Sequence, residues 1–144
     1  MTDSLSWFAW AMLSAVFAAL TAVFAKLGVQ AVDSDLATLI RTGVIICVLA
    51  CFVWLTGKWR NPAELGSRTW LFLTLSGLAT GASWVCYFRA LKLGAASKVA
   101  PVDKFSLVLV AIFAYLFLAE RPSAREWLGI GMVGAGVVIL AMKR

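Results

Sequence analysis

The segment that decides the fold of this chain is LATLIRTGVIICVLACFVWLT, residues 36–56. Arg41 is the only residue in it that carries a charge. An α-helix rises about 1.5 Å per residue, so about 20 apolar residues cross the ~30 Å hydrocarbon core of a bilayer. The segment therefore predicts a transmembrane helix.

Four further segments share this character. We predict membrane-spanning helices over Trp7–Val29, Leu36–Thr56, Trp70–Leu91, Val99–Leu118 and Trp127–Met142, the last extending back to Ala124. The chain has 144 residues, is 62% hydrophobic and 14% charged, and has a mean hydropathy of +0.93. A soluble domain this small cannot hide so much apolar surface from water. We therefore predict an all-α integral membrane protein, a five-transmembrane-helix bundle that forms one domain over residues 1–144.

Residues that the chain lacks exclude several kinds of function. It has no histidine, and Cys47, Cys51 and Cys86 match no metal-binding or redox spacing. No nucleophile stands beside a base, so we expect no enzymatic activity, no cofactor and no metal. The net charge of +6 comes from basic residues that flank apolar helices, so we expect the lipid bilayer, and no nucleic acid, as a partner.

Basic residues near the helix ends give the protein no clear orientation. Five crossings put the N-terminus and the 57–69 and 119–126 loops on one side of the membrane. That side carries Lys58, Arg60, Arg68, Arg121 and Arg125. The other side carries Lys92, Lys98, Lys143 and Arg144, with Lys26, Arg41, Arg89 and Lys104 near its helix ends. The positive-inside rule needs a stronger asymmetry, so we expect insertion in both orientations and an antiparallel homodimer.

Five ionisable side chains lie just inside the helix ends on this second side. They are Lys26, Arg41, Arg89, Asp103 and Lys104. A long basic side chain such as Lys26 can reach the headgroups at little cost, but the carboxylate of Asp103 is too short to do so. We expect Asp103 to pair with Arg89 or Lys104. The group predicts a charged gate, or the rim of a cavity, at one end of the bundle.

The third helix carries two motifs on one face. Gly77 and Gly81 form a small-xxx-small pair, which lets another helix approach closely. Trp84, and either Tyr87 or Phe88, follow on the same stripe, because spacings of three and four residues share a helix face. This face is either a packing seam or the lining of a pocket in which Trp84 contacts a substrate.

Pro101 has two interpretations. If the fourth helix begins at Val99, the proline marks its first turn, where no amide donor is needed. If the helix begins earlier, the proline interrupts the hydrogen-bond ladder near Asp103 and frees carbonyls that can line a cavity.

The fifth helix contains GIGMVG (129–134), which matches the dinucleotide-binding pattern G-x-G-x-x-G. That motif requires a preceding strand, so the match is false inside a membrane helix. Gly131, Gly134 and Ala135 instead predict a surface for packing between helices or subunits.

The stretch YFRALKLGAASKVAP (87–101) resembles the EamA domain of the drug/metabolite transporter superfamily. The segments LAE (118–120), WLG (127–129) and GAG (134–136) complete the pattern in the family's order, although Ala119 stands where the family commonly has glycine. The resemblance implies a five-helix repeat, which most members carry twice in inverted orientation. The chain is similar to short bacterial members that work as antiparallel homodimers, with the cavity between repeats and the third and fourth helices prominent in it.

From this resemblance we expect a secondary transporter that moves a small metabolite or drug-like solute across the bacterial inner membrane by alternating access. The expected substrate-binding residues are Trp84, Tyr87, Arg89, Pro101, Asp103 and Lys104, with Lys26 and Arg41 in the charged gate. No carboxylate lies at the middle of a helix, which disfavours a cation-extruding pump. The excess of basic residues favours an anionic or zwitterionic substrate. Two alternatives stay open: an accessory or flippase-type subunit for a lipid-linked head group, and a non-transporting partner of another membrane protein.

Overall fold

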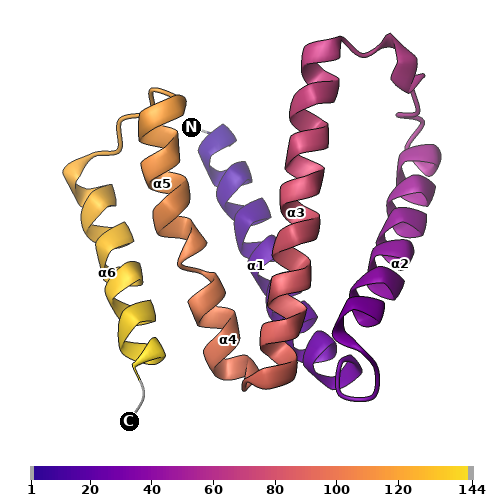
Figure 1. Cartoon of the computed structure of the whole chain (residues 1–144). Coiled ribbons are helices and arrows are strands. Elements are labelled where there is room, and N and C mark those ends of the chain that lie inside the picture. Colours follow the sequence, from indigo (N-terminus) through magenta and orange to yellow (C-terminus); the bar gives the residue numbers. More distant parts are fainter. Residues whose placement is uncertain (1, 143–144) are drawn as a thin grey trace. The chain divides into compact units, whose positions relative to one another are not determined.

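The computed structural model describes residues 2–142, with side chains from Trp7 onward. Lys143 and Arg144, which the sequence analysis counted as flanking charges, lie outside the described residues. The described chain forms helices α1 (Thr2–Gly28), α2 (Ser34–Leu55), α3 (Ser67–Leu93), α4 (Ala96–Asp103), α5 (Ser106–Phe117) and α6 (Ala124–Ala141), with a short 3-10 helix η1 at Pro62–Glu64 (Figure 1). It divides into two compact units, Met1–Leu93 and Gly94–Arg144.

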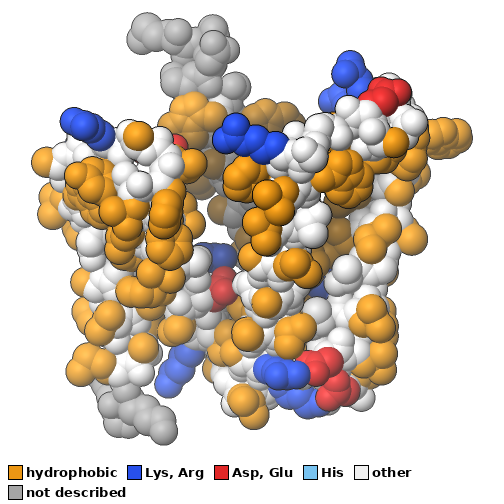
Figure 2. Space-filling model, turned by 45° about the horizontal axis from the view of Figure 1, so that its top comes forward, with side chains coloured by type: hydrophobic (Ala, Val, Ile, Leu, Met, Phe, Trp, Pro, Cys, Tyr) orange, Lys and Arg blue, Asp and Glu red, His pale blue; other side chains and the backbone are white. Residues whose placement is uncertain are grey.

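The prediction of five membrane-spanning helices is confirmed for residues 2–142. The segments long and apolar enough to cross a bilayer are Trp7–Gly28, Ser34–Leu55, Ser67–Leu93, Ala96–Phe117 and Ala124–Ala141. Large apolar side chains along them face outward, and Leu39 is 68% exposed. Figure 2 shows hydrophobic side chains over much of the visible surface of the helices. This surface suits hydrocarbon and not water.

The N-terminus of α2 and two of its hydroxyl groups are satisfied by local hydrogen bonds. The Asp33 carboxylate caps its N-terminus by accepting hydrogen bonds from the backbone N–H groups of Asp35 (2.9 Å) and Leu36 (3.3 Å). The Thr38 and Thr42 hydroxyls each donate to the carbonyl four residues earlier, at 2.8 Å. Such internal pairing is what allows hydroxyl residues to lie in a membrane span.

The first unit contains α1, α2 and α3, and α3 packs against both of the others. The C-terminal end of α1, the N-terminal end of α2 and the C-terminal end of α3 lie at the same end of this unit (Figure 1). Val29, Phe88 and Leu91 form its most buried part, each no more than 2% exposed. The charged residues predicted near these helix ends are thereby brought to one place.

In the second unit, the fourth span differs from the predicted continuous helix Val99–Leu118. It begins earlier, at Ala96, so Pro101 lies inside α4 and has no N–H to donate to the preceding turn. The ladder then changes, because the backbone N–H groups of Lys104 and Phe105 bond to the carbonyls three residues before them, both at 3.0 Å. The span is therefore two helices, α4 and α5, joined at Lys104 and Phe105.

The backbone just after α5 shows why glycine suits position 119, where this chain has alanine. Ala119 adopts a left-handed conformation with φ of 55°. This conformation costs a residue with a Cβ about 1 kcal/mol, whereas glycine adopts it readily. Glycine therefore suits this site physically. The next helix, α6, begins with a capping box in which Ser123 and Glu126 satisfy each other's backbone N–H groups.

Gly134 is the small residue of α6 that packs within the chain. It is buried, and a Cβ at this position would lie 3.2 Å from the Val108 Cγ2 on α5. Gly131 on the same helix is exposed, and a Cβ there would meet nothing within 4 Å. The predicted packing role of Gly134 is thus met by α5 of the same chain.

We predict that Gly134→Leu lowers the free energy of unfolding by about 1–3 kcal/mol, because the added side chain must displace Val108. Denaturation of the purified protein in detergent measures this change, with Gly131→Leu as the matched control, expected to have little effect. Adding Val108→Ala to Gly134→Leu should recover part of the loss. Equal destabilisation by the two leucine variants would contradict the packing argument.

Candidate functional site

Two lysines join the helix ends of the first unit. The Lys26 Nζ on α1 donates a 2.6 Å hydrogen bond to the carbonyl of Leu91 near the end of α3. The Lys92 Nζ donates to the carbonyl of Val32, in the α1–α2 connection, at 2.8 Å. The Leu91 carbonyl is in the last turn of α3, where carbonyls have no intrahelical partner, so a cation is well placed there. These lysines have a structural role that accounts for their position.

Arg89 forms a two-pronged ion pair with Asp35 at the start of α2. Its Nε lies 3.0 Å from one carboxylate oxygen of Asp35, and its Nη2 lies 2.6 Å from the other. Both side chains are exposed, at 59% and 49%. Such a pair is geometrically specific, because the planar guanidinium matches the carboxylate.

Asp35 is a functional candidate that the sequence analysis missed. Arg89 was expected to hold an anionic group or to pair with Asp103. Asp103 is in contact with Lys104, at 3.3 Å, which is the other partner expected for it. The signal for Asp35 was available: it is a carboxylate at the start of a helix on the same side of the membrane as Arg89.

Arg41 lies against two aromatic rings of α3. Its Cζ is 4.4 Å from the centroid of the Trp84 ring and 5.5 Å from that of Phe88. A guanidinium over an aromatic face is stabilised by the negative charge density of the ring. The sequence analysis selected Arg41 and Trp84 separately, and the packing of α2 on α3 brings them together.

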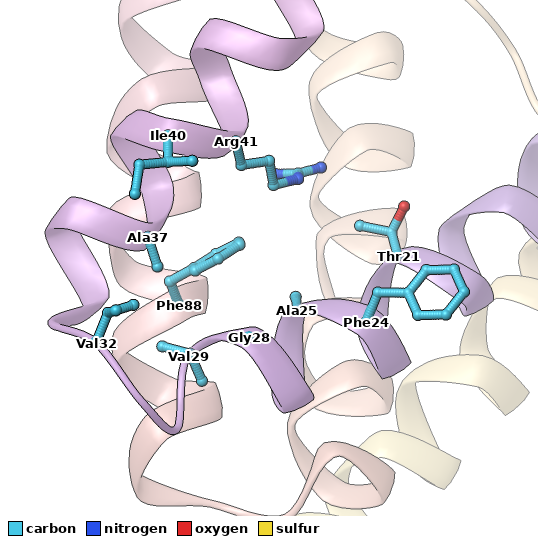
Figure 3. Close-up of a pocket in the computed structure, with 10 residues that line it drawn as sticks. All are labelled: Thr21, Phe24, Ala25, Gly28, Val29, Val32, Ala37, Ile40, Arg41 and Phe88. Atoms are coloured by element: carbon cyan, nitrogen blue, oxygen red, sulfur yellow. The ribbon is translucent and has the colours of Figure 1, made fainter.

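A pocket of about 520 Å³ opens beside this stack, within the first unit (Figure 3). Its size is within the range of small-molecule sites. Its walls come from α1, the α1–α2 connection, α2 and one residue of α3. They are Thr21, Phe24, Ala25, Gly28, Val29, Val32, Ala37, Ile40, Arg41 and Phe88.

Tyr87 and Trp84 are not among the residues that line this pocket. Tyr87 lies edge-on to Phe88, with 6.3 Å between the ring centroids, and Trp84 reaches the pocket only through Arg41. Their direct contact with a substrate stays a prediction. Phe88, which does line the pocket, was not among the substrate-binding residues expected from the sequence.

In the second unit, Pro101, Asp103 and Lys104 gather at the break between α4 and α5. Pro101 and Asp103 are half-buried there, and Lys104 is exposed. Lys104 and Phe105 keep right-handed helical dihedral angles, so the break is a tightened 3-10 turn. Such a turn in the middle of a helix often marks a functional hinge.

The remaining small residues singled out in the sequence lie on open surface. Gly77, Gly81 and Gly131 are exposed, and a Cβ added at any of them would meet nothing within 4 Å. Ala135 is also exposed. The faces that carry these residues are uncovered in the described chain, as a helix surface available to lipid or to another helix would be.

Comparison with known proteins agrees with this architecture. The model of the EamA-like transporter family matches residues 5–142. The chain belongs to the EamA-like transporter family. It is a multi-pass membrane protein that holds one repeat of five candidate membrane helices.

Bacterial relatives carry transporter names. The chain is 62% identical over 139 residues to an "uncharacterized transporter in cobO 3'region" of Sinorhizobium sp., covering 96% of this chain and 99% of that protein. It is 24% identical over 136 residues to the "uncharacterized transporter YxxF" of Bacillus subtilis (strain 168), covering 94% of this chain but 42% of that one.

A further likeness is to a flippase subunit. The chain is 26% identical over 104 residues to the probable 4-amino-4-deoxy-L-arabinose-phosphoundecaprenol flippase subunit ArnE of Yersinia pestis, covering 68% of this chain and 91% of that protein. No solved structure matches the chain.

The contacts of the two lysines give a test of how this family member holds its helix ends together. We predict that Lys26→Met lowers the free energy of unfolding by about 1.5 kcal/mol or more, because a half-buried charged hydrogen bond to Leu91 is lost. Lys92→Met is the matched control and should cost clearly less, because its hydrogen bond is exposed. Denaturation in detergent measures both, and a larger effect of Lys92→Met would contradict this assignment.

Proposed function

We propose that this protein is a secondary transporter of a small organic solute in a bacterial inner membrane, working by alternating access. The observation that carries the proposal is the interrupted fourth span of a member of a transporter family. Interrupted helices at which charged groups gather are typical of the substrate and gating regions of secondary transporters. Pro101, Asp103 and Lys104 lie at that interruption.

We further propose that the working unit is an antiparallel homodimer. Five crossings place the two ends of the chain on opposite sides, and the basic residues favour neither orientation. Two copies in opposite orientations would give the inverted-repeat arrangement of many transporters. The Bacillus subtilis relative, of which this chain spans 42%, is long enough to hold two such units. The exposed faces of Gly77, Gly81 and Gly131 are the candidate surfaces for the contact.

Dual insertion is testable by mapping the two termini. We predict that tags at both ends are labelled by a membrane-impermeant reagent from both sides of the membrane. The orientation should become fixed when basic residues are added to one side only. Gln30→Arg with Ala31→Arg should keep the α1–α2 connection in the cytoplasm, and Ala63→Arg with Leu65→Arg should give the opposite result. Labelling of the unaltered protein from one side alone would contradict the antiparallel dimer.

In this mechanism we assign the gate to the Arg89–Asp35 pair, in place of the Lys26 and Arg41 that the sequence analysis selected. The pair ties the end of α3 to the start of α2, two helices that supply walls of the pocket. It lies at an exposed helix end, where an ion pair can open and close without leaving a charge buried. The guanidinium does not line the pocket, which favours a gating role over direct contact with the substrate.

We predict that Arg89→Ala abolishes transport without preventing insertion, and that Asp35→Ala does the same. The exchange Asp35→Arg with Arg89→Asp should restore transport in part, because the ion pair is rebuilt with its charges reversed. Uptake of radiolabelled carboxylates, amino acids and organic cations by proteoliposomes measures this. Unchanged uptake in Arg89→Ala would disprove the assignment, and failure of the exchange would return Arg89 to the role of a substrate ligand.

A second function has one specific observation in its favour, the likeness to flippase subunits named ArnE. In that case the chain would act with a partner on a lipid-linked head group. Co-purification of one stoichiometric membrane partner, together with no solute uptake by the isolated protein, would favour this function over transport by a homodimer.

A further inference from the structure

Arg41 differs from the other charged residues of the first unit in its depth. It is the eighth residue of α2, so it lies about 10 Å along the helix from the capped end. Its ring partner Trp84 lies nine residues before the end of α3, about 13 Å along that helix. The stack holds the guanidinium at this depth, whereas a snorkelling arginine would extend toward the headgroups.

The guanidinium of Arg41 makes no hydrogen bond or ion pair with any residue that the structure describes. Lys26, Lys92 and Arg89 each donate to an oxygen of the protein. Arg41 lies over the faces of two rings and has Tyr87 as a favourable electrostatic neighbour. None of these interactions is a hydrogen bond, so its five N–H donors are left for another acceptor. Polar groups within a membrane span are normally paired, so this arrangement points to a ligand.

The pocket beside Arg41 has the complementary chemistry. In Figure 3 the Arg41 side chain extends from α2 into the space toward α1, with the Thr21 hydroxyl on the far side. Phe24, Ile40 and Phe88 form apolar walls, and no carboxylate is among the lining residues. A cation in this pocket would meet the charge of Arg41 with nothing to offset it.

We infer that this pocket binds an amphipathic organic anion, with its carboxylate or phosphate on the Arg41 guanidinium and its apolar part against Phe24, Ile40 and Phe88. Trp84 is then a positioning residue, which holds the guanidinium through its ring face. The inference rests on the proposed transport function for its biological meaning, and it names the substrate class of that function. The same chemistry fits a soluble organic anion and an anionic lipid head group.

The first test measures the charge that a solute meets in the pocket. In a background with Cys47, Cys51 and Cys86 replaced by serine, Ala37→Cys places a thiol on the pocket wall one helical turn from Arg41. In nanodiscs of phosphatidylcholine, a sulfonate-bearing methanethiosulfonate should label it about fivefold faster than a trimethylammonium-bearing one, after correction for their rates with a free thiol.

Matched variants locate the origin of this preference. Leu39→Cys lies two residues along α2 but is exposed and outside the pocket, so it should show no comparable preference. Arg41→Gln should remove the preference at position 37, and Arg41→Lys should keep most of it, because lysine retains the charge. Equal labelling rates of the two reagents at Ala37→Cys with Arg41 intact would overturn the inference. This outcome does not depend on whether any Arg41 variant folds.

The second test uses three small probes of one shape: benzoate, benzyl alcohol and benzylamine. Benzoate should slow labelling of Ala37→Cys at least threefold at millimolar concentration, and the neutral and cationic probes should not. Arg41→Gln should abolish this protection, and Arg41→Lys should weaken it, because it loses the planar fork that pairs with a carboxylate. Protection by benzylamine equal to that by benzoate would overturn the inference.

Lipid composition distinguishes the two sources of the anion. If phosphatidylglycerol in the nanodisc slows the labelling and benzoate then adds nothing, the occupant is an anionic lipid head group. If benzoate protects equally with and without phosphatidylglycerol, the occupant is a soluble anion. Either result supports the anion site, and absence of protection under both conditions overturns it.

Uptake by proteoliposomes separates this inference from the proposed transport function. Protection by benzoate with no uptake of any solute would overturn the transport function and leave the anion pocket standing. Uptake of a solute that benzoate neither inhibits nor displaces, with no protection of Ala37→Cys, would overturn the pocket and leave the transport function standing.

Discussion

The constraint on which this structure depends is that hydrocarbon offers no hydrogen bonds. Every backbone N–H and C=O within a span must therefore find its partner inside the protein, and continuous helices are the simplest solution. The hydroxyls of Thr38, Thr42 and Thr80 obey the same rule by bonding to carbonyls one turn earlier. The break after Pro101 is the informative exception, because the chain there changes its hydrogen-bond pattern within a span.

The charged residues of the first unit follow a related rule with two outcomes. At the helix ends, Lys26 and Lys92 donate to carbonyls and Arg89 pairs with Asp35, so these charges hold the ends of three helices together. Deeper in the span, Arg41 lies over the aromatic faces of Trp84 and Phe88. Ring faces stabilise a cation but leave its N–H donors unused. The first group therefore joins the helix ends, with the Arg89–Asp35 pair as the proposed gate, and Arg41 is the residue that we propose binds a ligand.

The small residues of the spans fall into two groups, those that pack within the chain and those on exposed helix faces. Gly134 packs against Val108 of the same chain, whereas Gly81 and Gly131 lie on open helix faces. These open faces are the surfaces through which the proposed homodimer would form. With five crossings, the two ends of one copy lie on opposite sides of the membrane. Two copies inserted in opposite orientations would be related by a two-fold axis in the membrane plane.

Much of this protein follows from its sequence alone. The five spans follow from hydropathy and length, and the EamA pattern in residues 87–101 led to the family to which the chain belongs. The spans are apolar on nearly all sides, however, so their periodicity carries little information about which face meets which neighbour.

Tertiary structure decided the pairings. Asp35 with Arg89 and Arg41 with Trp84 join residues more than forty positions apart, and each depends on the rotation and register of α2 against α3. The start of α4 at Ala96 was also known only from the structure. It decides whether Pro101 lies in the first turn of a helix or interrupts one. The sequence determined which segments enter the membrane, since transfer into lipid depends on composition. Packing decided which side chains meet there, because contacts between helices depend on geometry that composition does not specify.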